Sequence, residues 1–530
     1  MPYRSIRALI AATVLVASYA HAAAHDELHG KSLEALRLEL ASSKTTSEAL
    51  VRAYLERIDA IDRSGPTLRA VIALNPDALA QARALDEERK QKRVRGPLHG
   101  IPILIKDNVE TLDPMPTTAG SLALAASVTR RDAPIVANLR AAGAVILGKT
   151  NLSEWANFRS EHSISGWSGI GGLTKNPHVL DRSPCGSSAG SGAAIAASLA
   201  AASVGTETDG SIVCPSSMNG IVGLKPTLGL LSGQRIVPIA HSQDTAGPMV
   251  RTVRDAAIVL DAMVGKKPAC DSPLQGCKRA DYVAALSAGA LKGQRIGVLR
   301  FKEARQPQIE PIYTRALQVM RAAGAELIEV ESPDMELIYT AEDRVLHTEF
   351  KVDLNAYLGS LPPAIKTRTL ESLIGFNNRT PRETVLFGQD IFTKANGMPG
   401  VGDDNYRKAL ATSKRLAGPD GIDRLLREHK VNLLVAPTTG TAWRIDTANG
   451  DQFPGSFSTL PAVSGYPHLT LPMGKYRELP VGLSFIGAAW SEDKLLAAGY
   501  AFEQVAKVDV KAKFLTSIDA GNAGFEGAKQ

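Results

Sequence analysis

Aromatic residues, cysteine and net charge are all scarce in this chain of 530 residues. Aromatic residues make up 5%, four residues are cysteine, and the formal charge is only +6 from 60 basic and 54 acidic side chains. Four cysteines are too few to frame a small disulfide-rich domain, and 44% apolar residues exclude a disordered chain. The small basic excess is spread along the sequence, so it does not indicate nucleic acid as a partner.

Motifs for metals and nucleotides are missing or misleading. The chain has no H-E-x-x-H and no C-x-x-C pattern, which removes the common zinc-site signatures. Residues 143–150 match the phosphate-loop pattern G-x-x-x-x-G-K-[ST]. However, a phosphate loop follows its strand and offers free N–H groups, whereas the four central residues here form the predicted strand themselves. The sequence therefore argues against a nucleotide-hydrolysing enzyme.

A Ser-His-Asp hydrolase is the next pattern that the sequence suggests. Residues 186–190 match the G-x-S-x-G nucleophile elbow, but that elbow needs a buried strand before it. The preceding residues 180–184 are polar and contain proline. The downstream histidines, none with a supporting motif, are His241, His347, His429 and His468. We therefore disfavour a histidine-dependent triad.

The N-terminal segment has the pattern of a secretory signal. Two arginines precede an apolar run at residues 8–19, and an A-x-A site follows at residues 20–22. The run is shorter than the roughly 20 residues needed to cross a bilayer. We expect residues 1–22 to be a signal peptide, cleaved after Ala22 or Ala24. The mature protein is then exported to the periplasm or secreted, with no stable membrane association and a formal charge lowered from +6 to +4.

The four cysteines fall into two pairs. Cys270 and Cys277 flank a short turn-rich stretch and could close a small loop in an oxidising compartment. Cys185 and Cys214 lie within the serine-rich segments described below. For this second pair, two free buried thiols and a disulfide both remain open.

Helical and strand-like patterns alternate over most of the chain. The predicted strands are residues 68–74, 100–106, 144–147, 295–299, 326–330, 431–436, 469–472 and 481–486. The predicted helices include residues 45–64, 133–142, 188–202, 253–264, 311–323 and 494–505. This alternation predicts an α/β fold with one large sheet covered by helices. The polar, helical stretch at about 332–421 is expected to be a cap-like insertion.

One lysine and two serine-rich loops are the best candidates for chemistry. Lys106 ends a buried strand, and the loops at residues 185–191 and 206–211 follow later in the chain. Apolar surroundings disfavour the charged form of a lysine and lower its pKa. A fall from about 10.4 to about 7 costs roughly 4–5 kcal/mol of stability. A protein retains such an unfavourable neutral lysine only where the amine has a function. The alternative is an ordinary charged lysine whose ammonium group reaches water or a carboxylate, and for Lys106 considered alone this alternative is the better explanation.

The segments around these residues resemble the amidase signature family. Residues 97–108 resemble its lysine motif, and residues 148–151 resemble its next signature. The serine loops resemble its G-G-S-S-G-G-S and T-D-x-G-G-S segments, with the family's spacing of 24 residues between Ser187 and Ser211. Further matching segments are residues 220–227 and 479–483. Residues 206–215 look most like those of bacterial peptide amidases, which are also exported.

The resemblance implies a single large α/β domain with a mixed central β-sheet. It spans residues 32–507, includes the cap-like insertion, and leaves residues 508–530 as a C-terminal tail. It also implies a reaction without metal or cofactor.

Catalytic roles are implied by the same resemblance. Ser211 is the nucleophile, Ser187 relays a proton from a loop with a cis peptide, and neutral Lys106 is the base. The implied oxyanion hole consists of the backbone N–H groups of Thr208, Asp209, Gly210 and Ser211.

Four positions depart from the family pattern. Cys185 and Ala189 replace glycines, Glu207 stands where most members have Asp, and Asp209 stands where many have Gly. We expect structural roles for both acidic residues.

The sequence thus predicts an exported amidase that releases ammonia from the amidated C-termini of peptides. The alternatives are an amidase for aryl, fatty or other small-molecule amides and, from another class, an inactive binding protein with the same fold. A glutamyl-tRNA amidotransferase subunit is disfavoured, because export separates it from tRNA and ATP.

Overall fold

A computed structural model of the chain describes residues 28–300 and 307–519. The predicted signal peptide, residues 1–22, lies outside these ranges, as does the second half of the predicted tail. Within the described residues, no helix is both long and apolar enough to cross a membrane.

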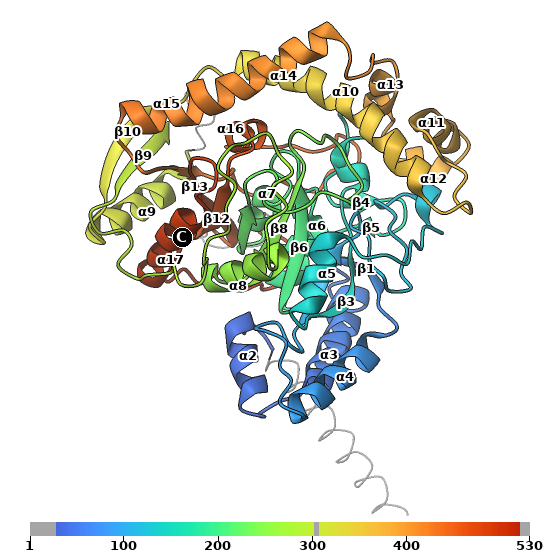
Figure 1. Cartoon of the computed structure of the whole chain (residues 1–530), viewed down its shortest axis with the longest axis horizontal. Coiled ribbons are helices and arrows are strands. Elements are labelled where there is room, and N and C mark those ends of the chain that lie inside the picture. Colours follow the sequence, from blue (N-terminus) through green and yellow to red (C-terminus); the bar gives the residue numbers. More distant parts are fainter. Residues whose placement is uncertain (1–27, 301–306, 520–530) are drawn as a thin grey trace, which may run out of the picture.

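A mixed sheet of 11 strands forms the centre of the molecule (Figure 1). Its strands are β1 (Val71–Leu74), β2 (Pro102–Lys106), β3 (Val145–Thr150), β6 (Ala202–Glu207), β7 (Val222–Lys225), β8 (Thr245–Val250), β9 (Arg295–Arg300), β10 (Glu326–Glu331), β11 (Leu433–Pro437), β12 (His468–Tyr476) and β13 (Leu479–Ile486). Their order in the sheet is β1-β3-β2-β6-β8-β7-β12-β13-β11-β9-β10. A separate pair consists of β4 (Trp167–Ser168) and β5 (Gly172–Leu173).

Parallel pairing occurs in two parts of the sheet. Strand β2 runs parallel to β3 and β6, and β9 runs parallel to β10 and β11, whereas the other neighbours are antiparallel. The predicted mixed sheet is therefore confirmed. Because parallel strands end at the same edge, residues that follow β2, β3 and β6 come close together.

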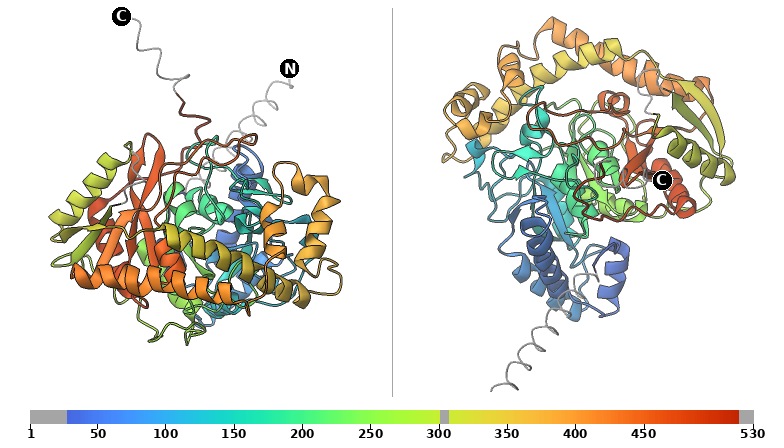
Figure 2. Two further views of the ribbon diagram at one scale, coloured as in Figure 1. Left: turned by 90° about the horizontal axis from the view of Figure 1, so that it is seen from above. Right: turned by 180° about the vertical axis from the view of Figure 1, so that it is seen from behind.

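Helices pack on the sheet and extend beyond it (Figures 1 and 2). They are α2 (Leu33–Ala41), α3 (Ser47–Arg57), α4 (Ala78–Lys90), α5 (Pro134–Ala141), α6 (Ala189–Ala196), α7 (Val213–Met218), α8 (Val253–Val264), α9 (Glu310–Ala322), α10 (Glu336–Ser360), α11 (Leu370–Asn378), α12 (Pro381–Thr384), α13 (Asp390–Asn396), α14 (Asp404–Ala417), α15 (Asp423–Glu428), α16 (Thr459–Ser464) and α17 (Glu492–Ala506).

The helix predicted over residues 188–202 is wrong in its second half. Helix α6 ends at Ala196, and Ala202 begins β6, where it pairs with Ile103 of β2. Small residues carry little helical periodicity, so pairing with the neighbouring strand decides the conformation here. Close packing explains the small residues of α6: a Cβ on Gly190 would lie 2.3 Å from the carbonyl oxygen of Ala70.

The predicted cap region consists mainly of helices, α10 to α14. Together with α15 they form an arc along one side of the molecule, on the side opposite to α2–α4 (Figure 1). A buried cluster that includes Phe350, Leu354 and Phe392 joins this arc to Trp155 of the main body. The arc is thus tied to the segment that follows β3, next to the site described below. Its boundaries as an insertion stay a prediction.

Candidate active site

Lys106 is the last residue of β2, and its side chain is fully buried. Its Nζ donates hydrogen bonds to Ser187 Oγ at 2.8 Å, to Thr206 Oγ1 at 2.9 Å and to the Thr206 carbonyl oxygen at 3.2 Å. Burial lowers the pKa of Lys106 to about 7, an effect partly opposed by Asp244 and Glu207. None of the ion pairs among the described residues involves Lys106. The lysine therefore reaches serine and threonine oxygens in place of a carboxylate.

Thr206 holds the lysine in place, and sequence reasoning missed it. Its hydroxyl oxygen accepts hydrogen bonds from both Lys106 Nζ and Asn108 Nδ2, each at 2.9 Å. Its backbone interacts with Ser188, whose Oγ donates to the Thr206 carbonyl at 3.1 Å and accepts from the Thr206 N–H at 3.2 Å. The only available signal was its place at the start of the second serine-rich loop.

Ser187 lies next to Lys106 in a loop with an unusual backbone. The Gly186–Ser187 peptide bond is cis, as the family resemblance implied, and the Ser187 side chain is fully buried. Its carbonyl oxygen accepts a hydrogen bond from the Ser153 N–H at 3.0 Å. A Cβ at Gly186 would approach Ser153 Oγ to 2.2 Å, so a larger residue before Ser187 requires the Ser153 side chain to move.

Ser211 is the member of the predicted set that reaches open space. It is 9% exposed, whereas Lys106 and Ser187 are at 0%. It follows Gly210, whose φ of +80° favours glycine, and its carbonyl oxygen accepts from the Ser188 N–H at 3.2 Å. Ser211 thus lines a cavity, whereas Lys106 and Ser187 are completely enclosed by the protein.

A cavity of about 530 Å³ opens in front of Ser211. The predicted oxyanion residues Thr208, Asp209 and Gly210 also line it. Apolar and aromatic side chains form other parts of the wall, namely Phe158, Ile239, Tyr339, Leu346, Ile391 and Phe453. Two of them, Tyr339 and Leu346, belong to α10, so the predicted cap contributes directly to the candidate substrate site.

The two acidic residues of the second serine loop have partners within the protein. Glu207 Oε2 accepts hydrogen bonds from the N–H groups of Ile212 and Val213, at 2.7 and 3.0 Å, where α7 begins. Asp209 Oδ2 accepts from Thr459 Oγ1 at 2.6 Å. Burial raises the pKa of both carboxyl groups. These contacts agree with the structural roles expected for them.

Both cysteine pairs form disulfides. The small loop proposed for Cys270 and Cys277 is present, and Cys185 is bonded to Cys214. For Cys185 and Cys214 the sequence left both a disulfide and two free thiols open, and the structure has the disulfide. It ties the loop before Ser187 to α7, which follows Ser211, and so connects the two serine-bearing segments covalently.

Histidine does not take part in this arrangement. No hydrogen bond of the described residues joins a histidine to Ser187 or Ser211. His468, for example, bonds to Ser484 Oγ at 2.6 Å, and burial lowers its pKa to about 3.

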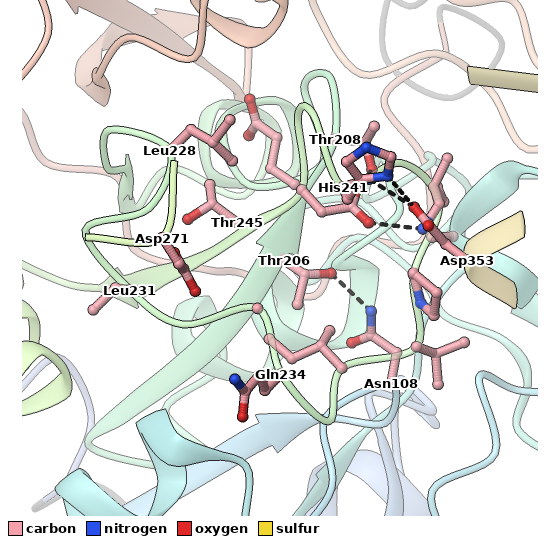
Figure 3. A pocket seen from close by; sticks show the side chains of 18 of the residues that line it. Asn108, Thr206, Thr208, Leu228, Leu231, Gln234, His241, Thr245, Asp271 and Asp353 are labelled. Atoms are coloured by element: carbon pink, nitrogen blue, oxygen red, sulfur yellow. Dashed lines mark hydrogen bonds and ion pairs between the residues drawn. The ribbon is translucent and has the colours of Figure 1, made fainter. Parts of the chain in front are cut away.

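A second cavity, of about 510 Å³, lies beside the first (Figure 3). Ala156, Thr208 and Ile239 line both cavities. In Figure 3 Asn108 and Thr206 are joined on one wall, and His241 faces Asp353 on another. The loop at residues 206–211 therefore borders open space on two sides.

These features define the class of protein. A family model described as Amidase matches residues 49–496, and the chain belongs to the amidase signature family. It is thus an amidase, a hydrolase of carboxamide C–N bonds, as predicted.

Solved structures and curated relatives give more detail. The native peptide amidase of Stenotrophomonas maltophilia is 48% identical, with a TM-score of 0.87 over 91% of this chain and 98% of that chain. A structure of the peptide amidase PAM with the competitive inhibitor chymostatin is also 48% identical, with a TM-score of 0.88 over 91% and 99% of the two chains. A probable amidase of Arabidopsis thaliana is 39% identical over 497 residues, which cover 91% of each chain.

Proposed function

We propose that this amidase hydrolyses the C-terminal carboxamide of peptides to a carboxylate and ammonia, with Lys106, Ser187 and Ser211 as its catalytic residues. The observation that carries the proposal is the 2.8 Å hydrogen bond between fully buried Lys106 Nζ and Ser187 Oγ, in a loop whose next residue, Ser188, donates its N–H to the carbonyl oxygen of cavity-lining Ser211. An amine with a pKa of about 7 is neutral often enough near neutral pH to accept a proton.

The proposed reaction has two halves. Ser211 Oγ attacks the amide carbonyl while its proton passes to Ser187, and the Ser187 proton passes to Lys106. The resulting oxyanion accepts hydrogen bonds from backbone N–H groups of residues 208–211. Collapse breaks the C–N bond, and the proton returns through Ser187 to the departing nitrogen, which leaves as ammonia. Water then attacks the acyl-enzyme by the same relay and releases the acid and free Ser211.

A peptide substrate is supported by the relatives and by the size of the cavity. The neighbouring structures include a peptide amidase and its complex with chymostatin, and about 530 Å³ lies in the range of sites that enclose small organic ligands. The aromatic wall, with Phe158, Tyr339 and Phe453, also favours a second candidate, an aryl or fatty carboxamide.

A substrate panel separates these candidates. Purified protein is incubated with peptide amides, anilides and fatty amides, and products are measured by mass spectrometry. We expect peptide amides to lose ammonia with the highest kcat/KM and Ser211→Ala to abolish the reaction. Equal hydrolysis by wild type and Ser211→Ala contradicts the proposal. Absence of fluorophosphonate labelling at Ser211 in folded protein supports the inactive binding protein instead.

We also propose that the protein is exported with residues 1–22 removed. The two disulfides support an oxidising compartment. N-terminal sequencing of protein from the periplasm or medium tests this, with Ala23 or His25 expected as the first residue. Recovery of an uncleaved chain from the cytoplasm alone contradicts it.

A further inference from the structure

The segment at residues 239–244 lies between helix α10 and the loop that carries Ser211. At its end, the Asp244 carboxylate uses both oxygens. Oδ1 accepts a hydrogen bond from Thr208 Oγ1 at 2.5 Å. Oδ2 accepts from the N–H groups of Ile239 and Ala240, at 2.7 and 3.0 Å. The Asp244 carboxylate thus bonds both to the start of its own segment and to the side chain of Thr208, a proposed oxyanion residue.

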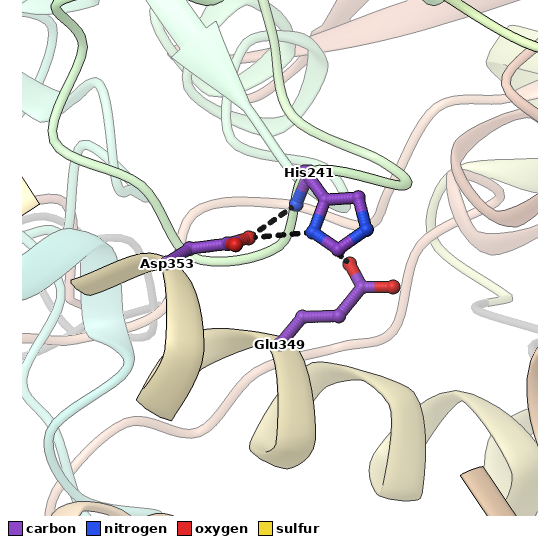
Figure 4. A group of neighbouring side chains, drawn as sticks. All are labelled: His241, Glu349 and Asp353. Carbon is purple, nitrogen blue, oxygen red and sulfur yellow. Dashed lines mark hydrogen bonds and ion pairs between the residues drawn. The ribbon is translucent and has the colours of Figure 1, made fainter. Parts of the chain in front are cut away.

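Helix α10 holds the other side of this segment. Three of its carboxylates accept hydrogen bonds from three consecutive residues, at 2.8–2.9 Å (Figure 4 shows two of these carboxylates). The pairs are the His241 N–H with Asp353, the Ser242 N–H with Glu349 and Gln243 Nε2 with Glu342. The three bonds join residues 241, 242 and 243 to helix positions 353, 349 and 342. A shift of the segment along the helix would therefore break all three.

Figure 4 shows that His241, Glu349 and Asp353 also gather the atom types of a metal site. In the structure these side chains bond to one another and to Tyr406. His241 Nδ1 bonds to Asp353 Oδ2 at 2.8 Å, and Glu349 Oε1 accepts from Tyr406 OH at 2.7 Å. A network of hydrogen bonds and an ion pair accounts for this group.

Two contacts of the segment converge on Thr208. Its hydroxyl is bound by Asp244, and its carbonyl oxygen accepts a long hydrogen bond from Gln243 Nε2 at 3.4 Å. Thr208 is therefore held through its side chain and through the peptide that follows it. An oxyanion hole works only when its N–H donors are fixed in advance, and misplacement by about 1 Å lowers turnover about 100-fold.

We propose that residues 239–244 form a positioning clamp that orients the oxyanion loop from helix α10, with Asp244 and Gln243 as its positioning residues. The inference rests on the proposed function of Ser211 but goes beyond it, since neither residue touches the reacting atoms. It also gives the cap a role in turnover, separate from lining the cavity.

Steady-state kinetics on a peptide amide tests the clamp. Asn at position 244 can keep the backbone contacts through its oxygen, but it offers Thr208 a neutral N–H donor in place of the carboxylate acceptor, so the short charge-assisted bond is lost. Thr208→Val removes the hydroxyl itself. We expect each of Asp244→Asn and Thr208→Val to lower kcat about 10- to 100-fold with KM within about twofold. The double variant should be no slower than the slower single variant, because both break one contact. Thr208→Ser should recover much of the loss.

Asp343→Asn is the matched control. Asp343 lies on the same helix, next to Glu342, but its carboxylate pairs with Lys394 at 2.8 Å and makes no hydrogen bond to residues 239–244 among the described contacts. We expect this variant to keep the wild-type kcat. Unchanged kcat in folded Asp244→Asn, additive losses in the double variant, or an equal loss in Asp343→Asn overturns the clamp. If Asp244→Asn does not fold, Gln243→Leu and Thr208→Val decide by the same criteria.

The rate of fluorophosphonate labelling at Ser211 separates the clamp from the choice of substrate. If wild type hydrolyses no peptide amide but is labelled, the proposed substrate is wrong, and slower labelling of Asp244→Asn still supports the clamp. Equal labelling rates overturn it. A wild-type protein that neither hydrolyses amides nor is labelled overturns the clamp together with the proposed function.

Discussion

Two fully buried lysines on neighbouring strands of this sheet have very different surroundings. Lys106 ends β2, and Lys149 lies in β3, where it pairs with Ile105. Lys106 Nζ contacts Ser187 and Thr206, whereas Lys149 Nζ lies 3.8 Å from Asp107 Oδ1 and donates to the Val109 carbonyl and to Thr117 Oγ1. Burial lowers the pKa of both amines.

The difference teaches that burial alone does not distinguish the proposed base from a structural lysine. Lys149 has a carboxylate beside it that opposes its loss of charge, which suits a structural ion pair. Lys106 has a hydroxyl as its nearest partner and a pKa of about 7, so its proton can be exchanged with Ser187. The partner, more than the burial, separates the two roles.

The largest expected effect is loss of turnover in Lys106→Met. Removal of the base should lower kcat/KM for a peptide amide by at least about 1,000-fold. The free energy of unfolding should not fall, because removal of a poorly solvated amine offsets the lost hydrogen bonds. Amide hydrolysis and urea unfolding measure the two quantities. Activity near the wild-type level would show that the base lies elsewhere.

The second expected effect is a loss of stability in Lys149→Met. This substitution leaves the buried Asp107 carboxylate without its partner, so the free energy of unfolding should fall by about 3–5 kcal/mol. In protein that remains folded, kcat should stay close to wild type. Urea unfolding at pH 8, above the pKa of about 6 that Asp107 has in the wild type beside Lys149, provides the measurement. A Lys149→Met protein that is stable but inactive would contradict the distinction between the lysines.

The pH dependence of activity should report the titration of Lys106. Below its pKa of about 7 the amine carries a proton and cannot accept one, so kcat/KM should fall about tenfold per pH unit as the solution is acidified. Above this pKa the profile should level off. Initial rates between about pH 5.5 and about pH 8.5 test it. A flat profile over that range argues against a neutral lysine as base.

The smallest effects should come from the threonines that contact each amine. Thr117→Val removes a hydrogen bond to Lys149, so stability should fall by about 1 kcal/mol while kcat is unchanged. Thr206→Val removes the equivalent bond to Lys106 and should lower kcat and move the pH profile. Paired kinetics and thermal unfolding of the two variants give the comparison. A loss of kcat in Thr117→Val without one in Thr206→Val would contradict the distinction between the two lysines.

Prediction from sequence succeeded where local pattern and family resemblance agree. The strand at residues 100–106, the mixed sheet and the helical character of residues 332–421 are all present. Prediction failed where a run of small residues shows no hydrophobic periodicity, as in the helix expected over residues 188–202. It also missed Thr206 and Asp244, because ordinary polar residues outside the recognised catalytic set gain a role only through their neighbours in space.

By itself, the sequence determined the family, the α/β class and the lysine and serines that became the candidate site. These features depend on motifs of about ten residues, within which side-chain chemistry and backbone preference act together. Only the tertiary structure decided that Lys106 meets Ser187 across 81 residues of sequence and that Cys185 joins Cys214. It also decided that α10 contacts the segment at residues 239–244. The physical reason is that such contacts depend on the order and register of strands, which no local pattern specifies.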